Sequence, residues 1–200
     1  MRKVGIESGK TYQQKLNSGF WDRYVVSPVP GLQPSVLDIG FKGHVEGHLP
    51  IVEGAIGVDL DYPGYDGRTL PFADQSQDAV YSSHCLEHIP DDLHAIREWH
   101  RVTRIGGHII IVVPHAYLYE RKMTIPHSQW NGDHKRPYTP ALLLKTVETA
   151  LLPNTYRVRH LCDNDTEYDY SIPPDQHPWL CYEIELVLQR ITPPTWTVGP

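Results

Sequence analysis

The chain has 200 residues, of which 40% are hydrophobic, 21% charged and 10% aromatic, and this globular balance favours a single domain. Its 18 Lys and Arg against 24 Asp and Glu give a formal charge of -6 without a basic cluster, which argues against binding to nucleic acid. The amino end has no apolar run after its charges and the 3 Cys are widely spaced, so we expect no signal peptide, no membrane span, reduced thiols and a cytoplasmic location.

Four short apolar runs predict strands that are buried on both faces. These runs cover residues 34–40, 55–60, 76–82 and 108–113. Pro114 ends the last of them, because proline cannot donate to a strand ladder. Residues 181–188 alternate with period two over their first half, which predicts a further strand with one solvated face.

Two segments carry the marks of helices. In residues 91–102, apolar side chains recur at near-helical spacing behind an acidic first turn, which predicts a helix that crosses between the third and fourth strands. Thr139 as N-cap, with Pro140 at the first position, predicts a second helix that Pro153 ends. Buried strands separated by helices indicate an α/β fold with a doubly wound, mostly parallel, Rossmann-like sheet.

Ligands bind beyond the carboxyl ends of the strands in such sheets, and polar residues follow each predicted strand. Those residues are Asp38 and Gly40, then Asp59 and Asp61, then Ser83, His84, Glu87 and His88, and finally His115. An acid at the end of the second strand, about 20 residues beyond a glycine-containing turn, is placed to hold ribose hydroxyls.

Five pieces of sequence follow one another in order between Pro34 and His115. They are residues 36–40, 57–59, 70–80, 86–89, and 101–102 with Gly106 and Gly107. Together they resemble the class I S-adenosylmethionine-dependent methyltransferases of the small-molecule, type 11-like kind. The resemblance implies one methyltransferase-like domain over residues 1–200, with a cofactor-binding half at 34–115 and the substrate side and final strands at 116–200.

The resemblance also implies a site for S-adenosylmethionine. Asp59 would bind the ribose, and Asp61 is the next candidate. The other implied cofactor contacts are Asp38, Gly40, Lys42 and Gly43 at the methionine end, Asp66, Gly67 and Leu70 around the adenine, and Leu60 and Ser83. The first turn departs from the family pattern Asp-x-Gly-x-Gly-x-Gly, because Lys42 and His44 replace two glycines. The Lys42 ammonium either pairs with the methionine carboxylate or points to solvent.

Residues 127–138 are polar and aromatic and resemble a stretch that many small-molecule members carry before a helix. The predicted substrate contacts are His88, His115, His127, Trp130, Asp133 and Tyr138. In the alternative, this is an ordinary loop in which Asp133 pairs with Lys135 or Arg136.

The predicted function is methyl transfer to a small-molecule or glycan-type acceptor, with oxygen slightly preferred to nitrogen. A hydroxyl must lose its proton, and a neutral histidine suits that task, which points to His84 or His134 as the catalytic base. The alternative is a non-catalytic binding or partner protein with a degraded cofactor turn. A homodimer is one arrangement that the sequence allows.

Residues 84–88 also form a His-x-x-Glu-His string, which can place two zinc ligands and a general-base glutamate on one helical face. The string lies inside the segment that resembles methyltransferases, and no downstream helix offers a matching glutamate. We therefore expect no metal, and His88 in this interpretation packs beside the sheet or caps a helix.

Overall fold

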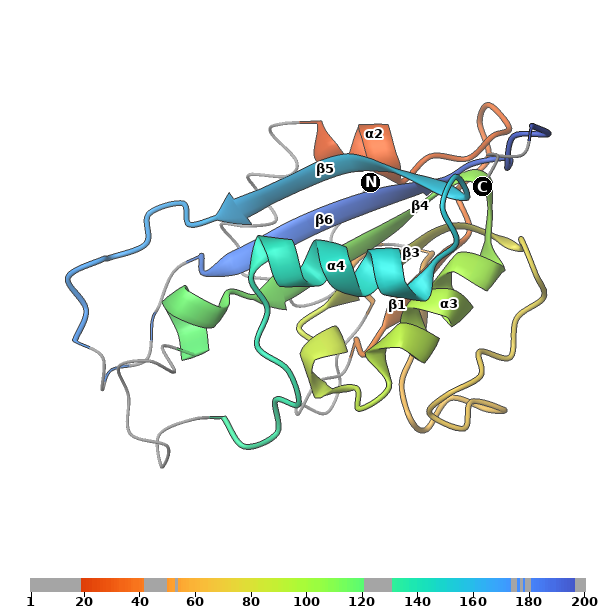
Figure 1. Ribbon diagram of the computed structural model, residues 1–200. Helices are drawn as coiled ribbons and strands as arrows, with labels where there is room; N and C mark the ends of the chain where they lie inside the picture. Colours follow the sequence, from red (N-terminus) through yellow and green to blue (C-terminus); the bar gives the residue numbers. More distant parts are fainter. Residues whose placement is uncertain are drawn as a thin grey trace.

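The computed structural model describes residues 19–41, 50–52, 54–120, 131–173, 176, 178 and 181–196. A six-stranded sheet with the order β2-β1-β3-β4-β6-β5 forms its centre (Figure 1). The strands are β1 (Val36–Ile39), β2 (Ile56–Val58), β3 (Gln77–Ser83), β4 (Thr103–Pro114), β5 (Tyr156–Asn164) and β6 (Glu183–Arg190). The first four are parallel neighbours, and β6 runs antiparallel to both β4 and β5. The predicted Rossmann-like α/β fold is confirmed.

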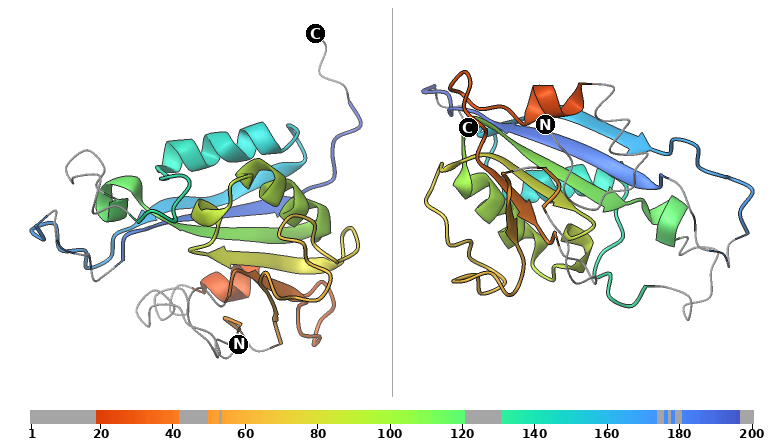
Figure 2. Two further views of the ribbon diagram at one scale, coloured as in Figure 1. Left: turned by 90° about the horizontal axis from the view of Figure 1, so that it is seen from below. Right: turned by 180° about the vertical axis from the view of Figure 1, so that it is seen from behind.

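Helices cover both faces of the sheet. They are α2 (Phe20–Tyr24), the 3-10 helix η1 (Leu86–His88), α3 (Asp92–Val102), the π-helical η2 (Ala116–Glu120) and α4 (Pro140–Ala150). The α3 and α4 helices lie on one face and α2 lies on the other (Figure 2). Within the described part of the chain, no helix is long and apolar enough to cross a membrane.

The two predicted helices begin as their sequences indicate. The Asp91 side chain accepts a hydrogen bond from the His94 backbone, and Thr139 does the same for Leu142. Each cap satisfies a backbone N–H that would otherwise lack a partner in the first turn.

Successive side chains along the central strands point alternately into two hydrophobic cores, one on each face of the sheet. Leu37 and Ile39 pack in the layer beneath α3 and α4, and Val36 packs in the layer beneath α2. Burial on both faces is therefore confirmed for β1. The same prediction was wrong for β2, where Ile56 is exposed because β2 lies at the edge of the sheet that the described residues form.

The prediction of a solvated face on the last strand was also wrong. Glu183 and Glu185 of β6 are both buried. The unpredicted strand β5 pairs along the outer side of β6, and Asn164 of β5 donates to both carboxylates. Burial of these two acids places carboxylates next to the carboxyl end of β4, where Pro114 is in register with Glu183.

Candidate active site

Neighbouring side chains pack closely against the glycines at the end of β1 and in β2. Gly40 has a φ of 73°, and its N–H donates to the Val58 carbonyl at 2.8 Å. A Cβ at this position would lie 2.4 Å from the Cys85 Sγ, so only glycine fits. The Phe41 ring packs in the same way against Gly57, which has no side chain to obstruct it.

Asp38, at the end of β1, is buried and already holds a backbone partner. Its Oδ2 accepts a hydrogen bond of 2.6 Å from the Ile51 N–H. This bond fixes the position of the segment that leads into β2. Two other predicted contacts of this turn, Lys42 and Gly43, lie outside the described residues.

Three predicted cofactor residues meet beyond the end of β2. Asp59 is half-buried, and Leu60 beside it is exposed. Gly67 has a φ of 79°, and a Cβ there would lie 3.3 Å from the Leu60 Cδ2. An acid and an apolar side chain are therefore presented together at the end of a buried strand.

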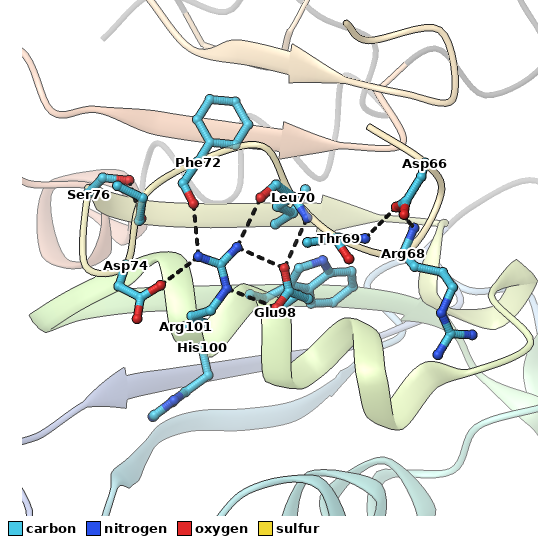
Figure 3. Close-up of polar contacts among 12 residues, drawn as sticks. Asp66, Arg68, Thr69, Leu70, Phe72, Asp74, Ser76, Glu98, His100 and Arg101 are labelled. Carbon is cyan, nitrogen blue, oxygen red and sulfur yellow. Dashed lines mark hydrogen bonds and ion pairs between the residues drawn. The ribbon is translucent and has the colours of Figure 1, made fainter. Parts of the chain in front are cut away.

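A clamp from α3 holds the segment that follows Gly67 (Figure 3). The Glu98 carboxylate accepts from the Leu70 N–H at 3.0 Å and pairs with Arg101 at 2.8 Å. Arg101 also donates to the carbonyls of Leu70 and Phe72, both at 2.9 Å, and to Asp74 at 2.7 Å. Because one guanidinium bridges three points, this clamp sets the path of residues 70–74.

Asp66 shapes the start of the same segment. Its Oδ1 accepts from the N–H groups of Arg68 at 2.9 Å and Thr69 at 2.6 Å, and these bonds hold the pKa of the carboxyl below its usual range. A cavity of about 240 Å³ opens between this segment and α3. Its lining includes Gly67 and Leu70, with Ile89, His94 and Trp99 on the opposite side.

His84 stands at the carboxyl end of β3 in a strained backbone conformation. Its φ is 51°, which is unusual for a residue with a Cβ, and such strain is often found at functional positions. The side chain is 35% exposed, and Nε2 lies 3.2 Å from Oε1 of the buried Glu183. A buried carboxylate thus orients an imidazole that solvent can reach. Ser83, the other predicted residue here, is partly buried at the end of β3.

His134, the other predicted base, has a different environment. Its side chain is 4% exposed, its Nδ1 contacts the Glu120 carboxylate, and its Nε2 lies 3.0 Å from the Asn131 Nδ2. Both ring nitrogens are therefore engaged, so His134 does not offer a nitrogen to an acceptor in this structure. A series of rings connects it to His84 through Tyr119 and Tyr182, with centroid separations between 4.9 and 5.9 Å.

The predicted substrate residues are dispersed. Tyr138 lies in the core, where its hydroxyl donates to Asp92 at 2.8 Å, and burial raises its pKa. Arg136 pairs with the same Asp92 at 3.1 Å, whereas Asp133 is exposed.

The remaining predicted contacts also differ in environment. His115 is buried and lies 3.4 Å from Asp163, while His88 stays partly open beside His134. His127 and Trp130 are outside the described residues.

Sequence reasoning missed the carboxylates that surround these histidines. The sequence pattern placed Glu183 on the solvated face of the last strand. Glu120 belongs to a π-helical turn, which has no characteristic spacing of apolar residues. A weak signal did exist for β5, because residues 156–159 read Tyr-Arg-Val-Arg, in which strand-forming and basic side chains alternate. Recognition of that strand would have predicted the burial of Glu183.

Comparison with known proteins locates the chain among methyltransferase folds. The profile of the Methyltransferase domain family matches residues 51–111. A demethylmenaquinone methyltransferase from Corynebacterium efficiens is 50% identical over 46 residues, which are 23% of this chain and 20% of that protein. The match thus spans about a fifth of the relative's length.

Two solved structures extend the similarity over most of the chain. An S-adenosylmethionine-dependent methyltransferase from Aquifex aeolicus aligns with a TM-score of 0.51 and 12% identity over 89% of each chain. The [4+2]-cyclase SpnF aligns with a TM-score of 0.58 and 14% identity over 96% of this chain and 88% of its own. At such low identity the likeness establishes the fold, and the chemistry has to be argued from the site.

Proposed function

We propose that this chain, which has the class I methyltransferase fold and matches the Methyltransferase domain family over residues 51–111, transfers a methyl group from S-adenosylmethionine to a small acceptor. The observation that carries the proposal is the pairing of two features at one edge of the sheet. Asp59 and Leu60 follow β2. His84 follows β3 and contacts the buried carboxylate of Glu183, the first residue of β6. The first pair fits a nucleoside, and the second fits proton removal.

In this proposal residues 34–115 form the cofactor half of a single domain. Asp59 binds the ribose hydroxyls as an acceptor of two hydrogen bonds. Leu60 and Gly67 offer an apolar edge to the adenine, and the cavity beside α3 gives the ring space. Asp38, Gly40, Asp66, Leu70 and Ser83 complete the proposed cofactor site, and several of them act by fixing the backbone around it.

Residues 116–200 form the proposed acceptor side. The cofactor supplies a sulfonium methyl group, and the protein aligns an acceptor in line with the methyl–sulfur bond. As the acceptor oxygen bonds to the methyl carbon, the carbon–sulfur bond breaks and S-adenosylhomocysteine leaves. His84 takes the hydroxyl proton, and the Glu183 carboxylate at 3.2 Å stabilises the imidazolium that forms.

The acceptor class follows from the same residues. The 35% exposed His84 ring serves an oxygen nucleophile, which needs a base, better than an amine, which is already nucleophilic when neutral. A small-molecule acceptor agrees with the partial match to a demethylmenaquinone methyltransferase, and the negative net charge argues against nucleic acid as the acceptor. The proposal places this protein in the cytoplasm.

A second candidate function is that of a non-catalytic binding or partner protein. The observation in its favour is the first turn, where Cys85 fills the space next to Gly40 and Lys42 replaces a glycine of the family pattern. SpnF, which is a cyclase by its name, also has this fold, so the fold alone does not fix the reaction.

The variants His84→Ala and Glu183→Gln test the proposed base. The assay measures the rate at which each variant releases S-adenosylhomocysteine with phenolic and glycosyl hydroxyl compounds as acceptors. Loss of the base lowers turnover by about 10²–10⁴-fold, with cofactor affinity unchanged. The control is His100→Asn, in the last turn of α3, where the imidazole bonds to the Thr155 carbonyl. Equal turnover in His84→Ala and the control would remove His84 from the mechanism.

A further inference from the structure

A second group of polar side chains lies next to the proposed active site. Glu87 and His88 belong to η1, and His134 comes from the segment before α4. One carboxylate oxygen of Glu87 and one ring nitrogen of each histidine all lie within 4.8 Å of one another. The two imidazole rings are nearly perpendicular, with centroids 4.6 Å apart.

The Glu87 carboxylate has too few partners for its degree of burial. The residue is 1% exposed, and neither carboxylate oxygen has a hydrogen-bond partner among the described residues. Its ion-pair contact is with His88, whose Nε2 lies 3.7 Å from the Glu87 Oε1. Within the described part of the chain no Lys or Arg pairs with it. A buried carboxylate is costly unless a cation or hydrogen bonds compensate it.

His134 is oriented as a metal-binding histidine would be. Its Nδ1 contacts the buried carboxylate of Glu120, and that arrangement fixes the ring and makes Nε2 the ligand atom. The second oxygen of Glu120 has no hydrogen-bond partner among the described residues. The Asn131 amide, 3.0 Å from Nε2, has to turn away for a cation to bind.

We propose that Glu87, His88 and His134 bind a divalent transition-metal ion, with Zn²⁺ the best match to these ligands. Two imidazole nitrogens and one carboxylate oxygen are a zinc ligand set that leaves the fourth position open. Small side-chain movements would bring the three ligand atoms to roughly 2.0–2.2 Å from the ion. His88 is 30% exposed, so it gives the ion access from solvent.

This ligand set differs from the one that the His-x-x-Glu-His string predicts. His84 is directed to Glu183, and Glu87 takes the part of a ligand instead of a general base. The third ligand comes from a loop that the string does not contain. The proposal is therefore independent of methyl transfer, although Tyr119 packs on His134 and connects the group to the acceptor side through Tyr182.

The test uses the full chain after treatment with a chelator, with Zn²⁺ added as the probe. Zinc is expected to raise the unfolding temperature in proportion to the logarithm of its concentration above the dissociation constant. Co²⁺ in place of Zn²⁺ should give the visible absorption of a tetrahedral nitrogen and oxygen site. Both responses should be lost in Glu87→Gln and His88→Asn, and Glu120→Gln should weaken binding by about 10- to 100-fold.

Glu87→Gln provides a second readout that does not require metal. Without zinc this variant should unfold at a higher temperature than the unchanged chain, because the substitution removes an uncompensated buried charge. With zinc the order should reverse. A variant that is less stable under both conditions would show that the carboxylate has a purely structural role and would contradict the proposal.

The matched control is the other group in the described residues with suitable spacing, His160, Cys162 and Glu185. In that group the imidazole already contacts Cys162 at 3.1 Å and Glu185 at 3.4 Å, so its members satisfy one another. Cys162→Ser should leave the zinc response intact. A response that disappears in Cys162→Ser, or survives in both Glu87→Gln and His88→Asn, would overturn the proposal, as would no response at all.

Discussion

Replacement of Arg101 by Met should release the segment that α3 holds beside the proposed adenine site. Arg101 donates five hydrogen bonds, two to Glu98 and one each to Leu70, Phe72 and Asp74. Met keeps the apolar stem and removes every donor. Breaking a buried ion pair costs roughly 3–5 kcal/mol, and an exposed pair costs at most about 1 kcal/mol.

The exposures of the partners set the expected magnitude. The Arg101 side chain is 28% exposed and Glu98 is 11% exposed, so solvent screens this pair only in part, whereas Asp74 is 71% exposed. We therefore expect Arg101→Met to lower the free energy of unfolding by about 2–4 kcal/mol, and Asp74→Asn by less than about 0.5 kcal/mol.

Urea denaturation measures both changes, and calorimetry with S-adenosylmethionine measures the effect on binding. Arg101→Met should also weaken cofactor binding, because the Leu70 carbonyl loses its donor and Glu98, which holds the Leu70 N–H, loses the cation that orients it. A cycle with Glu98→Gln should show strong coupling to Arg101, since the two side chains form one unit. If Arg101→Met costs no more than Asp74→Asn, the clamp does not hold this segment and the reasoning is refuted.

Three further changes test separate parts of the account. Gly40→Ala should lower the free energy of unfolding by roughly 1–3 kcal/mol, because the φ of 73° and the Cys85 side chain both oppose a Cβ. An unchanged midpoint of urea denaturation would contradict this prediction. Asp59→Ala should weaken S-adenosylmethionine binding by on the order of 1–3 kcal/mol at unchanged stability, and an unaltered affinity would transfer the ribose contact to Asp61. Burial lowers the pKa of His108 from 6.5 to about 4, so the unfolded chain binds a proton that the folded chain excludes. The free energy of unfolding should therefore be at its full value above about pH 6.5 and should fall by on the order of 3 kcal/mol towards pH 4. Denaturation at a series of pH values should show a smaller fall over this range in His108→Phe.

The sequence predicted correctly those helices and strands whose signals lie within their own residues. The apolar run of β1 and the capped helices α3 and α4 carry their signals within a few positions. The strand β5 was missed, and with it the burial of Glu185, because the environment of β6 depends on a partner about 25 residues earlier in the chain.

The same distinction applies to the site. The order of polar residues after each strand was predictable, since parallel strands end at one edge. The contrast between His84 and His134 was not predictable, because it depends on Glu183, 99 residues from His84, and on Glu120, 14 residues from His134 in a different element. A single sequence contains no local sign of which carboxylate will face which imidazole.

Calorimetric titration of the chain with S-adenosylmethionine tests the central claim most directly. The account predicts saturable binding of one molecule per chain, displaced by S-adenosylhomocysteine and weakened in Asp59→Ala. The absence of heat at millimolar cofactor, confirmed by the absence of any rise in unfolding temperature, would contradict the proposed enzyme and favour a protein that keeps the fold without the cofactor.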